Sequence, residues 1–233
     1  MDMKELRLQP RLAHIASLVP CDTRLADVGT DHGYLPVYLL RRGAIKSAIA
    51  SDLRSEPLAH AKRSAAEYGI EENIDFRLCS GLDGISPDEV DTVVIAGMGG
   101  ELIVKILEAA PWTRERALTL ILQPQTKAEV LRRWLSENGY RFVKESLVRD
   151  KGTLYAVLCV TAGKCEELSE EQTHLGLLLE QDALYGEYLD EYTAKLARAV
   201  SGMEMAKERD EAELSRLRAL KAAFARKREE WNG

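Results

Sequence analysis

The chain has 233 residues, 45% of them hydrophobic and 30% charged, and a formal net charge of −6. This predicts one domain, or one domain with an appendage, and a core of ordinary size. The absence of a run of about 18 apolar residues excludes a membrane-spanning helix, and the polar N-terminus lacks the apolar core of a signal peptide. Because its 4 cysteines form no C-x-x-C pair, we expect reduced thiols, no metal site and a cytoplasmic protein. The sequence leaves the oligomeric state open between a monomer and a dimer.

Charge is unevenly distributed along the chain. Residues 1–164 contain equal numbers of acidic and basic residues, so the acidic excess lies in residues 165–233. We expect a folded domain over 1–164 and a second, helical part over 165–233. Neither part is broadly basic, which argues against strong non-specific binding of nucleic acid but leaves room for a local basic face.

Apolar residues at helical spacing, among them Leu8, Leu12 and Ile15, predict a helix over residues 4–19 that ends near Pro20. Arg7 and Arg11 lie on its other side. We interpret these arginines as a solvated face, with contact to phosphates as the alternative.

The stretch 23–36 predicts a short buried strand, a tight turn and the start of a helix. Gly29 and Gly33 give the backbone freedom where a ligand approaches closely, and a helix N-terminus presents free N–H groups. Asp27, at the end of the strand, places a carboxylate beside this donor-rich turn. An ordinary strand-to-helix turn, in which Gly and Asp are common, is the alternative.

The spacing of this turn is acidic-x-Gly-x-x-x-Gly, which lacks the Gly-x-Gly-x-x-Gly fingerprint of dinucleotide sites. Asp31 stands where the second glycine would be, and its carboxylate would repel a pyrophosphate. A ligand with a positive centre would not be repelled. S-adenosyl-L-methionine, which carries a sulfonium and an ammonium group and no phosphate, fits this turn.

A helix over residues 35–42 and a strand over 47–50 follow, and the strand closes on Asp52. An acidic residue about 20 positions past a glycine turn is placed to accept the two ribose hydroxyls of an adenosine. Capping of the next helix is the alternative for Asp52.

A second glycine-bearing turn follows a helix over 57–68 and a strand over 74–78. It contains Gly81, Leu82 and Asp83. Leu82 is placed to pack on an adenine, and Asp83 is placed to accept from the adenine amino group.

A buried strand over residues 90–96 opens onto the loop 97–100, in which three of four residues are glycine, and a helix over 101–109 follows. Such a loop indicates close approach of a ligand at the carboxyl end of a strand, the edge at which open parallel sheets bind ligands. A flexible hinge is the alternative.

A fifth strand over 118–122 precedes a helix over 126–138. Strands over 140–148 and 153–161, joined by a tight glycine-containing turn, predict an antiparallel hairpin. Strands alternating with helices and closed by this hairpin predict an α/β fold with a Rossmann-like, doubly wound sheet of seven strands.

From about Glu166, Gly and Pro nearly vanish and apolar residues fall three, four or seven apart, which predicts a coiled-coil-like helical hairpin. Its turn would lie at Ser201 and Gly202 or in the charged stretch to Asp210; a single long helix is the alternative. Basic residues near its end would contact RNA phosphates or form a solvated helix end: Lys221, Arg226, Lys227 and Arg228.

Three strings occur together in this chain: Asp27-Val-Gly-Thr-Asp-His-Gly-Tyr-Leu-Pro36, Ile95-Ala-Gly-Met-Gly-Gly100 and Leu122-Gln-Pro124. With them the chain resembles, over nearly its whole length, the bacterial tRNA (adenine-N1)-methyltransferases that modify position 22 of tRNA. The resemblance implies a class I methyltransferase domain that uses S-adenosyl-L-methionine and a helical hairpin that helps to bind tRNA.

The resemblance and the turn pattern together assign the site. The cofactor would be held by Asp27, Gly29, Thr30, Gly33, Asp52, Leu53, Gly81, Leu82, Asp83, Ala96, Gly97, Met98 and Gly99. Substrate contacts would come from Arg7, Arg11, Gln123 and Pro124, with Gln123 on the adenine edge.

The catalytic candidates are Asp31, His32 and Tyr34. Attack of adenine N1 on the sulfonium methyl group produces a cationic ring, which Asp31 would stabilise, or whose amino group would lose a proton to Asp31; binding the cofactor's ammonium group is the alternative. His32 and Tyr34 would orient or stack on the base, unless Tyr34 faces the core.

Two other functions stay open: a methyltransferase for a protein or small molecule, and a non-catalytic S-adenosyl-L-methionine-binding adaptor.

Overall fold

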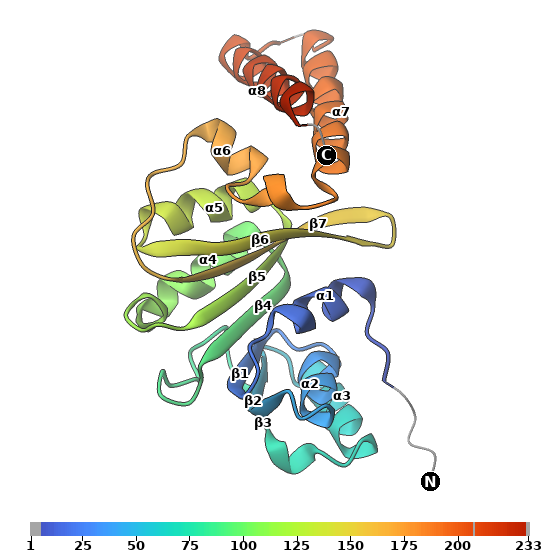
Figure 1. Ribbon diagram of the computed structural model, residues 1–233, viewed down its shortest axis with the longest axis vertical. Helices are drawn as coiled ribbons and strands as arrows, with labels where there is room; N and C mark the ends of the chain where they lie inside the picture. The colour runs from blue at the N-terminus through green and yellow to red at the C-terminus, as the bar shows by residue number, and fades with distance from the viewer. Residues whose placement is uncertain (1–5, 207, 232–233) are drawn as a thin grey trace. The chain divides into compact units, whose positions relative to one another are not determined.

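The computed structural model describes residues 6–206 and 208–231, and the chain divides into two compact units, one up to Glu167 and one from Leu168 (Figure 1). The first unit contains a seven-stranded sheet in the order β3-β2-β1-β4-β5-β7-β6. Its strands are β1 (Thr23–Val28), β2 (Ile45–Asp52), β3 (Ile74–Leu78), β4 (Thr92–Gly99), β5 (Thr119–Thr126), β6 (Tyr140–Asp150) and β7 (Thr153–Ala162). The first five are parallel, and β7 is antiparallel to both β5 and β6, so the predicted fold is confirmed.

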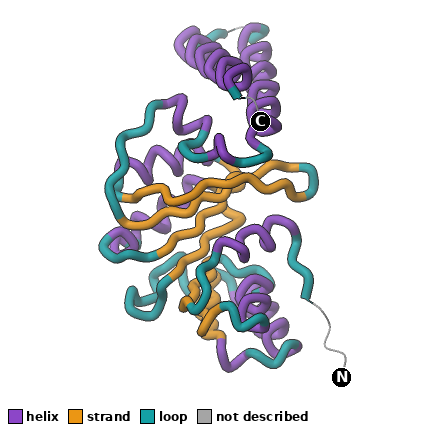
Figure 2. The backbone as a smooth tube through the Cα atoms, viewed as in Figure 1, coloured by secondary structure: helices purple, strands orange, loops and turns teal. Residues whose placement is uncertain are grey.

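Helices cover this sheet. They are α1 (Pro10–Leu18), α2 (Tyr34–Arg41), α3 (Ser55–Glu67), α4 (Gly100–Ala109) and α5 (Ala128–Glu137), with short 3-10 turns η1 (Glu71–Asn73) and η2 (Pro111–Arg114). α2 packs on β1 and β2, α3 on β2 and β3, and α4 on β4 and β5 (Figure 2). The central strands are therefore covered, and Val93, Val94 and Ile95 of β4 are fully buried, as a continuous apolar run in a parallel strand predicts.

The first helix is shorter than predicted. Its first residue is Pro10, and the preceding Gln9 is extended, with φ −62° and ψ 153°. A proline disfavours helical conformation in the residue before it, so the apolar spacing that included Leu8 does not extend the helix toward the N-terminus. Residues 4 and 5 of the predicted helix lie outside the described part of the chain.

The second unit consists of α6 (Glu170–Leu175), η3 (Leu179–Gln181), α7 (Tyr185–Glu204) and α8 (Glu211–Glu230). α7 and α8 pack against each other, so the single long helix is wrong and the turn lies in the charged stretch before Asp210. Ser201 and Gly202 are helical. The rings of Tyr192 and Phe224 stack across the helix pair at 4.6 Å between centroids.

No helix among residues 6–206 and 208–231 combines the length and apolar character needed to span a membrane.

Candidate active site

A cleft of about 830 Å³ lies in the first unit, at the carboxyl ends of β1, β2 and β4. The turn between β1 and α2, the end of β4 and the segment that enters α1 all contribute to its walls. Most of the predicted site residues are brought together here: Asp27, Gly29, Thr30, Asp31, His32, Gly33, Tyr34, Asp52, Ala96, Gly97 and Met98, with Arg7 and Arg11.

The floor of the cleft requires a glycine at position 29. Gly29 has a φ of +77°, and a Cβ there would lie 2.1 Å from Cε of Met98. The N–H groups of Gly29 and Thr30 donate to the Ser51 carbonyl oxygen at 2.8 and 2.9 Å. These two donors are therefore used to hold the turn on β2, and Pro36 in the first turn of α2 has no N–H, so the turn is poorer in free donors than the sequence predicted.

Asp27 is a buried carboxyl at the end of β1. Burial raises its pKa to about 6, and the neighbouring Asp52 adds to the shift, while the nearby Thr30 hydroxyl lowers it in part. At ordinary hydrogen-bond geometry, however, the buried Thr30 hydroxyl has no partner among the described residues. A cationic group that donates hydrogen bonds would favour the ionised form of Asp27 and satisfy Thr30, so these residues fit the ammonium group of S-adenosyl-L-methionine.

Asp52 is also buried, and it has a local role. Its Oδ1 accepts a hydrogen bond from the Arg54 N–H at 2.8 Å, and the Arg54 side chain approaches the same oxygen at 3.7 Å. Arg54 is the N-cap residue of α3. Asp52 thus shapes the entry to α3 while it lines the cleft. It does not cap the helix, because the N–H from which it accepts belongs to the N-cap residue.

The glycine run after β4 is not a loop, contrary to the prediction. β4 continues through Gly99 because β5 continues beside it, pairing Met98 with Pro124 and Gly99 with Thr126 across two register shifts. Gly97 has a φ of +80°. This pairing argues against the hinge and fixes Gly97 and Met98 in the wall of the cleft, whereas Gly99, a predicted cofactor residue, is not among the described residues that line it.

Gln123 is fully buried behind that wall. Its Oε1 accepts from the Gly97 N–H at 3.1 Å and from Arg11 Nη1 at 2.6 Å. Neither Gln123 nor Pro124 is among the described residues that line the cleft. Gln123 is therefore not placed to contact the base edge, contrary to the prediction, and instead holds Gly97 and Arg11 in position. Gln125, two residues further along the chain, is exposed and lines the cleft.

Arg11 is not part of a solvated face. Its side chain is only 20% exposed and lies 3.9 Å from Asp150 Oδ2, in addition to its bond with Gln123. Its guanidinium also lies over the Tyr155 ring, 5.9 Å from the centroid. Arg7, by contrast, is exposed where it lines the cleft.

The three catalytic candidates form one cluster on the turn before α2. The His32 ring stacks on Tyr34, with centroids 5.1 Å apart and planes at 15°, and His32 Nε2 lies 3.5 Å from Asp31 Oδ2. Tyr34 is 40% exposed, so the core-facing alternative is wrong. All three side chains are available to a molecule that enters the cleft.

The turn that carries Gly81 to Asp83 is outside the cleft lining. Leu82 is 2% exposed and Asp83 is exposed, while a Cβ on Gly81 would lie 3.0 Å from Ile106. Contact of Leu82 with an adenine would therefore need a movement of this turn. Leu53, next to Asp52, is 71% exposed and gives an accessible apolar surface at the same edge of the sheet.

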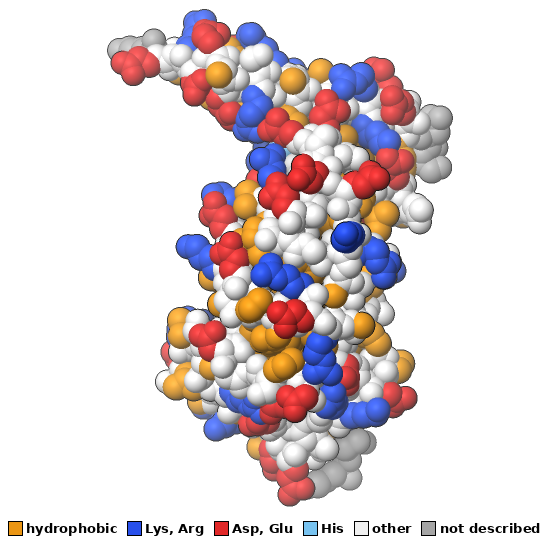
Figure 3. All heavy atoms as spheres, turned by 90° about the vertical axis from the view of Figure 1, so that its left-hand side faces the viewer, with side chains coloured by type: hydrophobic (Ala, Val, Ile, Leu, Met, Phe, Trp, Pro, Cys, Tyr) orange, Lys and Arg blue, Asp and Glu red, His pale blue; other side chains and the backbone are white. Residues whose placement is uncertain are grey.

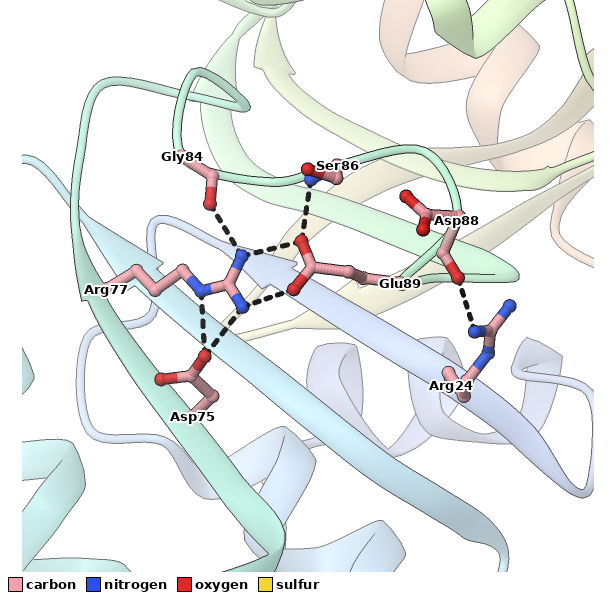
Figure 4. Close-up of polar contacts among 7 residues, drawn as sticks. All are labelled: Arg24, Asp75, Arg77, Gly84, Ser86, Asp88 and Glu89. Carbon is pink, nitrogen blue, oxygen red and sulfur yellow. Dashed lines mark hydrogen bonds and ion pairs between the residues drawn. The ribbon is translucent and has the colours of Figure 1, made fainter.

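Arg77 of β3 anchors this turn, which the sequence analysis missed. Its guanidinium donates to the Gly84 carbonyl at 2.6 Å and to both oxygens of Glu89 at 2.8 and 2.6 Å (Figure 4). It also bonds Asp75, and Glu89 accepts from the Ser86 N–H. One local indication of these contacts was present in the sequence, the spacing of Asp75 and Arg77 on one face of a strand. The pairing with Glu89 had none, because Glu89 lies 12 residues after Arg77.

Comparisons with known proteins give the family of this chain. Residues 8–158 match a family model described as a methyltransferase domain. The chain is 35% identical over 187 residues to the tRNA (adenine(22)-N(1))-methyltransferase of Bacillus subtilis strain 168, covering 80% of this chain and 76% of that protein.

Two solved structures are similar over almost the whole chain. One is the B. subtilis m1A22 tRNA methyltransferase, with a TM-score of 0.85 and 29% identity over 95% of this chain and 99% of that one. The other, from Streptococcus pneumoniae, was solved in complex with S-adenosyl-L-methionine and has a TM-score of 0.84 and 33% identity over 94% of this chain and 99% of that one. The chain therefore belongs to the tRNA (adenine(22)-N(1))-methyltransferase family, as the three sequence strings predicted.

Proposed function

We propose that this protein transfers a methyl group from S-adenosyl-L-methionine to N1 of the adenine at position 22 of tRNA. The observation that carries the proposal is the buried floor of the cleft, where the Asp27 carboxyl and the unpartnered Thr30 hydroxyl favour a cationic, hydrogen-bonding ligand. Family membership supports the acceptor.

When bound, S-adenosyl-L-methionine supplies an electrophilic methyl group on a positive sulfur. Adenine N1 forms a bond to that carbon as the carbon–sulfur bond breaks and its electron pair returns to sulfur. Alignment of the two reactants contributes up to about 7–11 kcal/mol to such a displacement. The protein's main task is therefore to hold two molecules in register and exclude water.

The described side chains divide this task. Asp27 and Thr30 hold the cationic end of the methyl donor, and Asp52 accepts from ribose hydroxyls. Asp31 lies at the opening of the cleft and is 78% exposed on its side chain, so it can approach an incoming base, stabilise the cationic ring and accept a proton from the amino group. Tyr34 presents a ring for stacking, and Gln125 an amide for the base edge.

The base has to leave the tRNA fold to enter the cleft, at a cost of a few kcal/mol.

We place the methyltransferase domain in residues 1–164 and assign the tRNA-contacting role to the hairpin in residues 165–233. Affinity for the folded RNA would come mainly from shape and phosphate contacts. The protein would act in the cytoplasm, where its substrate is found, and as a monomer.

The charges of the hairpin limit how it binds RNA. Three of the four basic residues near its end are engaged in ion pairs within the second unit: Arg226 with Glu171, Lys227 with Glu180, and Arg228 with Asp190. Figure 3 shows, on the face that it draws, blue and red side chains intermixed over these helices rather than one basic area. The hairpin would therefore contact tRNA through a few phosphates, with exposed Lys221 as the first candidate.

Transfer of a labelled methyl group to unmodified tRNA tests the proposal. The expected product is 1-methyladenosine at position 22, and a tRNA with guanine at that position should accept no label. Label on a protein or small molecule instead would support a methyltransferase of another acceptor. Cofactor binding without transfer to any acceptor would support an adaptor, and both results would overturn the proposal.

A further inference from the structure

His60 is a second histidine beside the cleft to which neither the sequence analysis nor the proposed function gives a role. It lies on α3, whose buried face is formed by Pro57, Leu58, Ala61 and Ala65. His60 is outside that face and half-buried, so packing in the core does not account for it.

The turn that carries Asp31 and His32 packs directly on α3 beside His60. Gly33 has a φ of +65°, and a Cβ at this position would lie 2.9 Å from Cβ of Ala61. This close approach brings the two histidine rings to 5.0 Å between centroids, tilted by 52°. The Nδ1 atoms of His60 and His32 are 3.3 Å apart, within hydrogen-bond distance.

The position of Asp31 decides the direction of that hydrogen bond. His32 Nε2 lies 3.5 Å from Asp31 Oδ2, and an ionised carboxylate only accepts hydrogen bonds. This contact favours a neutral His32 with its hydrogen on Nε2, because a bare Nε2 would face the carboxylate with a lone pair. Its Nδ1 is then the acceptor, and the hydrogen between the two rings belongs to Nδ1 of His60.

We infer that His60 is a positioning residue, which donates to His32 and thereby fixes the tautomer and orientation of the His32 ring. The hydrogen bond runs from His60 Nδ1 to His32 Nδ1, and the Nε2–H of His32 faces Asp31 Oδ2 at 3.5 Å. Tyr34 stacks on the face of the same ring, so the ring plane and its rotation about the Cβ–Cγ bond are both restrained. This inference rests on the proposed function, in which Asp31 and His32 meet the acceptor base.

Three substitutions at one position separate hydrogen bonding from packing. His60→Asn places an amide N–H close to the position of Nδ1, so it should preserve the donor. His60→Gln moves the amide to the position of Nε2, and His60→Leu keeps bulk without any donor. All three are made in the full-length chain, and circular dichroism and thermal melting confirm that each variant folds.

The first measurement is independent of activity. A two-bond ¹H–¹⁵N correlation spectrum at about pH 8 reports which ring nitrogen carries the hydrogen, and single His→Gln variants assign the signals of the 4 histidines. We expect the Nε2–H form of His32 in the wild type and in His60→Asn, and a mixture of tautomers in His60→Leu and His60→Gln. An Nδ1–H form of wild-type His32, or the same spectrum in His60→Leu, would overturn the inference.

The second measurement is steady-state methyl transfer to tRNA. We expect kcat to fall roughly tenfold in His60→Leu and His60→Gln, with the KM for S-adenosyl-L-methionine unchanged and with activity retained in His60→Asn. Wild-type kcat in His60→Leu would show that His60 positions nothing needed for turnover. If the wild type methylates no tRNA, the proposed function fails, whereas the His32 spectrum still decides the direction of the hydrogen bond.

Discussion

The raised pKa of Asp27 predicts that cofactor affinity depends on pH. The carboxyl titrates at about 6 because it is buried and lies near Asp52, and a cation bound against it would favour its ionised form. At pH 5, about one-tenth of the free protein carries an ionised Asp27, so the affinity for S-adenosyl-L-methionine should be roughly tenfold lower than above pH 7, equivalent to about 1.4 kcal/mol.

Isothermal titration calorimetry between about pH 5 and pH 7 measures this dependence. Repeating the titrations in two buffers with different ionisation enthalpies gives the number of protons released, which should be about one-half near pH 6. Asp27→Asn is the matched control, since it keeps the size of the side chain and removes the titration. A dissociation constant that is the same at both ends of this range, with no proton release, would refute the assignment of a cation to this carboxyl.

The same variant has a predicted effect on stability. The folded-state pKa of Asp27 lies above its ordinary value of 3.8, so the folded state binds the proton more tightly than the unfolded chain. The stabilisation from this proton is complete below about pH 4 and is lost as the pH rises through 6. Near pH 7, the free energy of unfolding of Asp27→Asn should therefore be higher than that of the wild type by about 1–3 kcal/mol. Urea denaturation of both proteins measures this difference.

Three other substitutions test neighbouring parts of the site. Arg11→Met should weaken cofactor binding about three- to tenfold by releasing Gln123 and Gly97, without changing how tRNA affinity depends on salt; a salt slope reduced by about one would identify Arg11 as a phosphate ligand. Asp31→Ala should lower kcat by roughly 10²–10³ with cofactor affinity retained, whereas weaker cofactor binding at normal kcat would assign Asp31 to the ammonium group. Arg77→Met should cost about 1 kcal/mol of stability near neutral pH, a modest value because its acidic partners are partly exposed. Arg77 lowers the pKa of Glu89 from 4.5 to about 2. The loss of stability in the variant should therefore become smaller as the pH falls from 4.5 toward 2, as measured by acid unfolding.

Local patterns were sufficient to predict the sheet and the floor of the cleft. The apolar run Val93 to Ile95 indicated a strand covered on both faces, and the glycines around Asp31 indicated a turn that a ligand approaches. These signals are local, because each depends on residues adjacent in the chain. Pro10 was an equally local signal for the start of the first helix, which the apolar spacing outweighed.

The rest of the site depends on contacts between distant segments. Gln123 was predicted to reach the base, but it is buried because Arg11, 112 residues earlier, and Gly97 both donate to it. The pair of His32 and His60 joins residues 28 positions apart. No spacing rule connects such residues, because their proximity is set by the packing of α1 and α3 on the sheet.

The most direct test of the account is a comparison of three ligands by calorimetry on the full-length protein near pH 7. The floor between Asp27 and Gly33 should bind S-adenosyl-L-methionine, and Asp27→Asn should weaken that binding, while NAD and ATP should give no binding heat. Tight binding of NAD or ATP, with none of S-adenosyl-L-methionine, would contradict the central claim that this floor accepts a cationic methyl donor and rejects a diphosphate.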